Sequence, residues 1–185
     1  GCKGGHSGIQ IICQRANANK LMFRLLRKLS AQMELKIASV DGGGLRNAIP
    51  RECVATVLVK SADVESALAM VAEFEKVAQA EFAGIEDSIS IKAQKTAPAT
   101  QIIPCALAKA LMAAMVACPD GVDKMSMAME GLVQTSNNMA RVVSDGSSIK
   151  VQTLVRSSVR SEKEALADAI KATLEFAGFD VVLSG

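Results

Sequence analysis

The sequence predicts an α+β fold in which an antiparallel sheet carries helices on one face. Half of the 185 residues are apolar, which is enough to bury a sizeable core. Segments with an apolar residue every three or four positions, typical of amphipathic helices, alternate with short apolar segments bounded by glycine and proline, typical of strands. Their order in the first half, β-α-β-β-α-β, is that of a ferredoxin-like sandwich.

The first half, residues 1–95, is expected to begin with a short strand at residues 9–13 and a helix from Leu21 onward. Either Asn17 or Asn19 can cap the amino end of this helix through its side-chain oxygen. The buried face of the helix carries apolar residues at helical spacing: Met22, Leu25, Leu26, Leu29 and Met33.

Two strands follow, at residues 35–40 and 53–59. They are joined across three glycines, residues 42–44, which permit the positive φ of a tight turn. The second strand is apolar on both faces and is therefore expected at the centre of the sheet. A second helix opens at Asp63, whose carboxylate can cap it, and a strand at residues 88–93 completes this half.

The second half, residues 96–185, follows a connector at residues 94–100 and loosely repeats the same layout. The two sheets could join edge to edge into one extended sheet, a point that the sequence leaves open. The expected elements are a helix at residues 103–115 that ends before Pro119, strands at 129–136, 139–144 and 149–157 with a turn at Asp145-Gly146, a helix with a capping box from Ser161 to Glu164 that ends at Gly178, and a strand at 179–183.

Composition and charge exclude several classes of function. With 21 basic and 19 acidic side chains, the net charge of +2 is too small to favour nucleic acid or an anionic membrane as partner. Five phenylalanines without tryptophan or tyrosine offer few stacking platforms for bases. The longest apolar stretch, residues 103–118, is too short to span a membrane. Five irregularly spaced cysteines and the missing signal peptide favour reduced thiols in the cytoplasm.

His6 is the only histidine in the chain. A catalytic metal site needs several His, Asp, Glu or Cys ligands, and a serine or cysteine nucleophile normally needs a histidine base. Neither a metal site nor a nucleophile with its base is recognisable in the sequence. We therefore expect the chain to deliver single side chains to a centre held elsewhere. Its start at Gly1 rather than at a methionine suggests a part of a longer protein.

Three side chains are candidates for binding a substrate. His6 lies in a glycine-rich segment that lets a ligand approach its ring, although a lone histidine is more often structural. Asn47, between the glycine turn and Pro50, could bind a carboxylate or carbonyl, or complete a turn. Arg156, on the face opposite the apolar residues of its strand, could bind a carboxylate through two hydrogen bonds or form a surface ion pair. The polar residues 135–138 could supply further donors, but a polar turn is the favoured interpretation.

Four motifs together resemble a known family. They are KGGHSG at residues 3–8, RANANK at 15–20, LRNAIPRE at 45–52 and LVRS at 154–157. Their order and content closely resemble the lid domain of bacterial aminoacyl-histidine dipeptidases, also called Xaa-His dipeptidases or bacterial carnosinases, of the co-catalytic zinc exopeptidase family. The resemblance covers essentially the whole chain.

This resemblance implies a dimeric parent enzyme that hydrolyses Xaa-His dipeptides, with two divalent metal ions, usually zinc, in a catalytic domain that is absent from this chain. His6 matches the lid histidine that stabilises the oxyanion at the scissile carbonyl. Asn47 and Arg156 match the lid residues that bind the terminal carboxylate of the substrate. The isolated chain is then expected to be inactive. The alternative is a non-catalytic ferredoxin-like module for protein interaction or small-molecule sensing.

Overall fold

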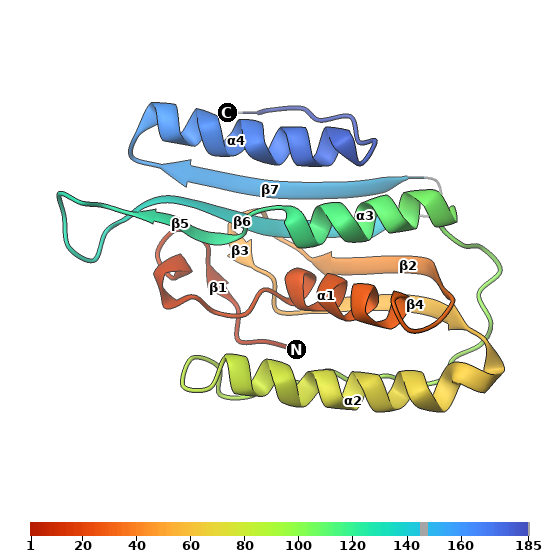
Figure 1. Cartoon of the computed structure of the whole chain (residues 1–185). Coiled ribbons are helices and arrows are strands. Elements are labelled where there is room, and N and C mark those ends of the chain that lie inside the picture. Colours follow the sequence, from red (N-terminus) through yellow and green to blue (C-terminus); the bar gives the residue numbers. More distant parts are fainter. Residues whose placement is uncertain (145–147, 185) are drawn as a thin grey trace.

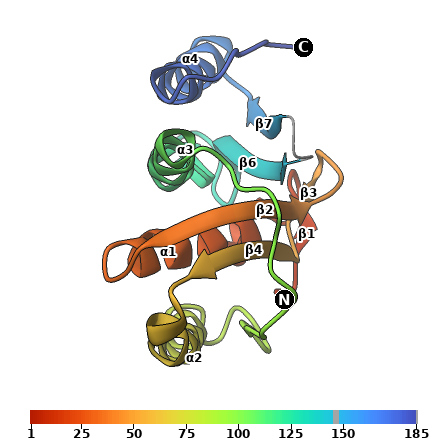
Figure 2. The same ribbon diagram turned by 90° about the vertical axis from the view of Figure 1, so that its right-hand side faces the viewer.

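The computed structural model describes residues 1–144 and 148–184. In this part of the chain, one five-stranded antiparallel sheet carries the helices on one face, which confirms the predicted α+β class (Figure 2). The elements in chain order (Figure 1) are β1 (Gly5–His6), a 3-10 helix (Ile11–Cys13), α1 (Ala18–Ser30), β2 (Leu35–Gly43), β3 (Ala48–Ile49), β4 (Cys53–Val59), a 3-10 helix (Ser61–Asp63), α2 (Val64–Glu81), α3 (Cys105–Ala117), β5 (Gly121–Met125), β6 (Val133–Ser144), β7 (Ile149–Ser157) and α4 (Arg160–Phe176).

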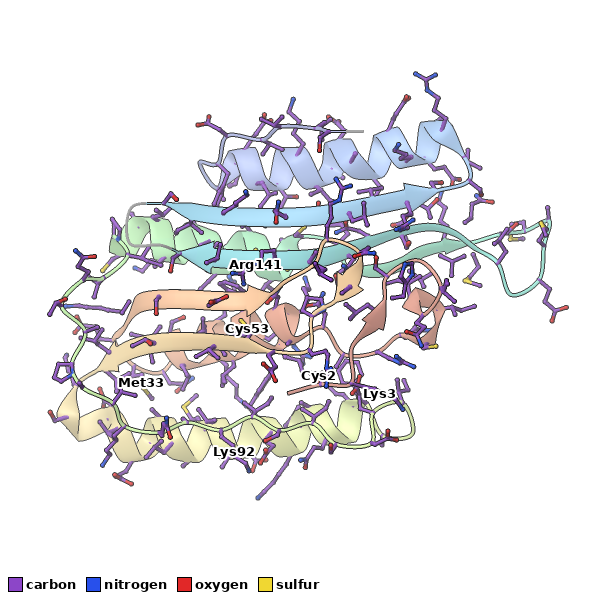
Figure 3. All side chains as sticks on the ribbon, turned by 180° about the vertical axis from the view of Figure 1, so that it is seen from behind. Cys2, Lys3, Met33, Cys53, Lys92 and Arg141 are labelled. Atoms are coloured by element: carbon purple, nitrogen blue, oxygen red, sulfur yellow. The ribbon has the colours of Figure 1, made fainter. Side chains whose placement is uncertain are left out.

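Strand β6 joins the two halves of the chain. Along one edge it pairs with β7 from Thr135 to Ser144. Along the other edge its first part pairs with β5, and its last residues pair with β2, where Gly42 lies opposite Val142. The two halves therefore share one extended sheet. On the open face (Figure 3), Arg141 reinforces this junction, because it donates to the carbonyl oxygens of Gly42 (3.1 Å) and Gly43 (2.9 Å).

Strand β4 is an outer strand of the sheet, next to β2, so its predicted central position is wrong. Its apolar residues on both faces suggested burial on both sides. The helices cover only one face of the sheet, however, and Val54 on β4 remains 67% exposed. Apolar side chains on both faces of a strand do not by themselves indicate a central position.

The core lies between the sheet and the helices on it. Helices α1, α3 and α4 pack on the sheet, and the other side of α1 packs against α2, so α1 contributes to two clusters of buried side chains. The first cluster includes Phe23, Leu26, Ile37, Val40, Leu111, Met115, Met139, Val142, Ile170 and Leu174, and the second includes Leu21, Leu25, Leu29, Val71, Phe74 and Ala78.

The four predicted helices are present, and the last one is terminated as predicted by Gly178, which has a φ of +87° and an amide that donates to the carbonyl of Glu175 (2.9 Å). Of the predicted amino-terminal caps, only one is present. The side chain of Asn17 accepts hydrogen bonds from the backbone of Asn19 (3.0 Å) and Lys20 (3.4 Å), as a cap does. Asp63 makes no side-chain cap because it already lies in a 3-10 turn. The capping box at Ser161 is also wrong, since α4 begins one residue earlier and Glu164 binds Arg160 (2.8 Å) instead.

Three predicted strands are not strands. Residues 9–13 contain a short 3-10 helix instead. Residues 88–93 run along α2, where Gln79 donates to the carbonyl of Ile89 (2.8 Å) and Glu75 accepts from the amide of Ile91 (2.9 Å). Side chains of α2 thus take the place of a neighbouring strand. The segment at 179–183 packs Phe179 and Val181 on the core without pairing to any described strand.

The predicted strands at residues 129–136 and 139–144 are one continuous strand, β6, and its partner β5 was not predicted. The favoured interpretation of residues 135–138 as a turn is therefore wrong. These four side chains, Thr135, Ser136, Asn137 and Asn138, are each at most 3% exposed. Serine and asparagine are common in turns, so the local sequence of this run gave no signal of its burial. The predicted turn at Asp145-Gly146 lies outside the described residues.

Candidate functional site

The three candidate residues, which come from distant parts of the sequence, lie close together. Asn47 and Arg156 line the same open hollow, which has a volume of about 580 Å³. His6 and Arg156 both lie next to Gly8: a methyl group on Gly8 would be 3.1 Å from His6 Cε1 and 3.4 Å from Arg156 Cζ. The amide, the guanidinium and the imidazole therefore surround one small region at the end of the sheet.

A short two-stranded ribbon holds His6 beside Asn47. Strand β1 pairs with β3, which places His6 opposite Ala48, and the amide of Ser7 donates to the carbonyl of Asn47 (2.9 Å). The side chain of Gln10 accepts a hydrogen bond from the amide of His6 (2.9 Å). These contacts fix the backbone of the histidine relative to the asparagine.

The imidazole of His6 is held in one tautomer. Its Nδ1 atom accepts hydrogen bonds from the backbone amides of Gly8 (3.1 Å) and Ile9 (3.2 Å). Because both partners are donors, Nδ1 carries no proton, so the neutral ring carries its proton on Nε2. The ring is exposed, and no hydrogen bond to Nε2 is found within the described residues. His6 can therefore donate a hydrogen bond from Nε2 to an incoming oxygen.

Gly4, just before strand β1, cannot be replaced by a larger residue because its surroundings are closely packed. Gly4 has a φ of +69°, and a Cβ at this position would lie 2.1 Å from Cγ of Arg51. The carbonyl of Gly4 also accepts a hydrogen bond from Arg15 (2.6 Å). Glycine is needed here for positive φ and for this close approach, and the ribbon that carries His6 depends on both.

Asn138 anchors the segment that carries Asn47. It is 1% exposed, and its Nδ2 group donates to the carbonyl oxygens of Arg46 (3.2 Å) and Ala48 (2.8 Å), one on each side of Asn47. Asn47 itself is exposed. The buried amide of Asn138 thus fixes the backbone around Asn47, and within the described residues the side chain of Asn47 makes no hydrogen bond that would compete with a ligand. This role was not predicted from the sequence, because Asn138 was expected to lie in a turn.

Arg156 lies on the face of β7 that is opposite the core, as predicted. The next residue, Ser157, shares a hydrogen bond with Thr135 (2.8 Å), whose hydroxyl also donates to Glu162 (2.8 Å). Hydrogen bonds from Gln134, Thr135 and Lys124 lower the pKa of Glu162 to about 2. The carboxylate therefore stays charged and ties the end of β7, next to Arg156, to the first turn of α4.

The RANANK motif at residues 15–20 has a structural role. Asn17 donates to Asp120 (2.9 Å), and Asn19 donates to the carbonyl of Met139 (3.1 Å). Lys20 donates to three carbonyls at the carboxyl end of α3, and burial lowers its pKa. Burial raises the pKa of Asp120, although hydrogen bonds to its carboxylate oppose the shift. This polar layer fixes α1 and α3 to β6.

The described residues do not contain a set of ligands for a metal ion: no three His, Cys, Asp or Glu side chains among them are close enough to share one. The donors at the hollow and beside it are an amide, cations and the imidazole of His6, which suit an anionic or carbonyl oxygen rather than a metal. Within the same residues, no helix is both long and apolar enough to cross a membrane.

Comparisons with known proteins relate the chain to peptidases. Residues 1–86 match the family described as the peptidase dimerisation domain. An aminoacylhistidine dipeptidase from Vibrio alginolyticus, known from a crystal structure, matches all of this chain with a TM-score of 0.97 and 33% sequence identity. The predicted resemblance to an aminoacyl-histidine dipeptidase is confirmed, and the matching part is described as a dimerisation domain.

The chain also resembles a protein named cytosol non-specific dipeptidase from Escherichia coli (strain K12), with 30% identity over 178 residues, or 96% of this chain. The chain spans 37% of the length of the Escherichia coli protein and 38% of the Vibrio chain. More than half of each relative therefore lies outside the part that this chain matches.

Proposed function

We propose that this chain is the lid of a metal-dependent dipeptidase and that His6, Asn47 and Arg156 bind the substrate from the lid side. The observation that carries the proposal is that Asn47 and Arg156 line one open hollow, while His6 lies near Arg156 at the position of Gly8. The similarity to two dipeptidases over nearly the whole chain supports it. No comparable observation favours the alternative of a sensing module.

Each side chain has a chemical task in this proposal. The Nε2–H group of His6 donates to the scissile carbonyl oxygen and stabilises the negative charge that develops there. Arg156 binds the terminal carboxylate of the dipeptide through two charge-assisted hydrogen bonds, and the amide of Asn47 donates a further one. Together they orient the peptide bond, and none of them acts as a nucleophile.

The remaining machinery would lie in a catalytic domain outside this chain. Two divalent metal ions, which we propose to be zinc, would supply an activated water there. We further propose that the parent protein is cytoplasmic, that it forms a homodimer through the dimerisation domain, and that it cleaves Xaa-His dipeptides. The isolated chain is expected to hydrolyse no dipeptide.

The proposal is tested by kinetics on the full-length protein. Replacing an oxyanion donor typically costs about 10²–10³ in kcat, so His6→Ala should lower kcat by about that factor with little change in KM. Arg156→Gln should mainly raise KM, and it should remove the preference for a free terminal carboxylate over a carboxamide. Arg160→Gln is the control, because Arg160 is 91% exposed and pairs with Glu164. Native kinetics in both His6→Ala and Arg156→Gln would contradict the proposal.

A further inference from the structure

The hollow beside Arg156 contains more positive charge than one terminal carboxylate requires. Three cations line it: Arg46 from the segment before β3, Arg156 from β7 and Lys163 from α4. Its other lining residues are neutral, namely Asn47, Leu154, Val155 and Ser157. A single guanidinium can bind a carboxylate through both oxygens, so Arg46 and Lys163 remain for a second anionic group.

The two acidic residues next to Lys163 in the sequence do not neutralise these cations. Glu162 pairs with Lys124 (3.0 Å) and accepts hydrogen bonds from β6, and Glu164 pairs with Arg160 (2.8 Å). Among the described residues, no ion pair involves any of the three cations of the hollow. Their charge is therefore available to a ligand.

The backbones that carry the two additional cations are fixed. The carbonyl of Arg46 accepts a hydrogen bond from the buried side chain of Asn138 (3.2 Å). The amide of Lys163 donates to the carbonyl of Val159 (3.0 Å) in the first turn of α4. Cations on fixed backbones lose less entropy when they bind an anion than cations on mobile loops do. The hollow of about 580 Å³ also falls in the range of sites that hold small organic molecules, ~300–1,000 Å³.

We propose that Arg46 and Lys163 form a second anion subsite that binds the side-chain carboxylate of an acidic C-terminal residue. Xaa-Glu and Xaa-Asp dipeptides would then be substrates alongside Xaa-His, and an acidic C-terminal residue would be cleaved better than its neutral amide counterpart. This inference rests on the proposed function, because it assigns the terminal carboxylate to Arg156.

The test compares Ala-Glu with Ala-Gln, which differ in charge but hardly in size, as substrates of the full-length protein. A hydrogen bond between charged groups predicts kcat/KM for Ala-Glu about tenfold above that for Ala-Gln, with a preference that shrinks as salt is added. The double variant R46Q/K163Q should bring the ratio close to one while changing kcat/KM for Ala-Gln less than about threefold. The control is Lys171→Gln on the same helix, since Lys171 pairs with Glu175 and does not line the hollow.

The outcomes separate this inference from the proposed function. Equal kcat/KM for both substrates in the native protein, or a preference that the double variant retains, would overturn the second subsite while leaving the dipeptidase lid intact. Failure of the native protein to cleave any dipeptide would overturn the proposed function itself. A loss of the Glu preference in Lys171→Gln would show that general charge, not this subsite, causes it.

Discussion

Asn138 offers the sharpest test of how the fold positions the site. The change Asn138→Ala removes two hydrogen bonds, to the carbonyls of Arg46 and Ala48. A hydrogen bond contributes about 1 kcal/mol net, so the free energy of unfolding should fall by about 2 kcal/mol. Within the described residues the other side-chain atom, Oδ1, is buried without a partner, so its removal adds no further cost. The loss therefore comes from the contacts of Nδ2.

The same change should weaken substrate binding, because the segment around Asn47 loses its anchor to β6. We expect KM of the full-length protein to rise about five- to tenfold, which corresponds to about 1–1.4 kcal/mol. Stability is measured by urea denaturation and KM by steady-state kinetics.

The matched control is the neighbouring Asn137. It is equally buried at 1% exposure, but its Nδ2 group donates to the carbonyl of Pro119 (2.7 Å), away from the hollow. Asn137→Ala should cost about 1 kcal/mol of stability and leave KM unchanged. If both variants raise KM equally, or if Asn138→Ala leaves KM at its native value, the anchoring role assigned to Asn138 is wrong.

Two further predictions concern stability. Gly43 has a φ of +73°, and a Cβ there would lie 1.9 Å from the carbonyl oxygen of Ala140, so Gly43→Ala should cost about 2–3 kcal/mol in urea denaturation. Gly44→Ala, with no atom within 4 Å of the added carbon, should cost less than about 0.5 kcal/mol, and equal losses would contradict this account. The pKa of Glu162 is lowered from 4.5 to about 2, so the unfolded chain takes up this proton at higher pH than the folded chain. Its contribution to stability should be complete above about pH 5 and lost as the pH falls toward 2, and Glu162→Gln should flatten this part of the pH profile.

The helices were predictable because they depend on local sequence. A helix satisfies its backbone hydrogen bonds within one segment, and the apolar spacing from Met22 to Leu29 identifies the face that α1 buries. The side chain of Asn17 caps α1 for an equally local reason. The strands were predicted less well, since a strand needs a partner from elsewhere in the chain. Residues 88–93 have the alternation of a strand, yet α2 side chains bind their backbone instead.

The polar residues 135–138 were also assigned wrongly from local sequence, here as a turn although they lie in a strand. Their sequence favours a turn, but in the fold each of these side chains is buried, and Asn137 and Asn138 donate to carbonyls of distant segments. Burial of an amide is favourable only when it finds partners, and those partners are contributed by Pro119 and Ala48. Local sequence contains no information about them.

The sequence by itself determined the α+β class, the four helices and the identity of His6, Asn47 and Arg156 as candidates, because periodicity and motif content are properties of the chain alone. Only the tertiary structure decided that β2 pairs with β6, that a buried asparagine anchors the loop of Asn47, and that Arg46 and Lys163 join Arg156 around one hollow. These facts depend on hydrogen bonds and packing between residues about 100 positions apart, which form only when the whole sheet assembles.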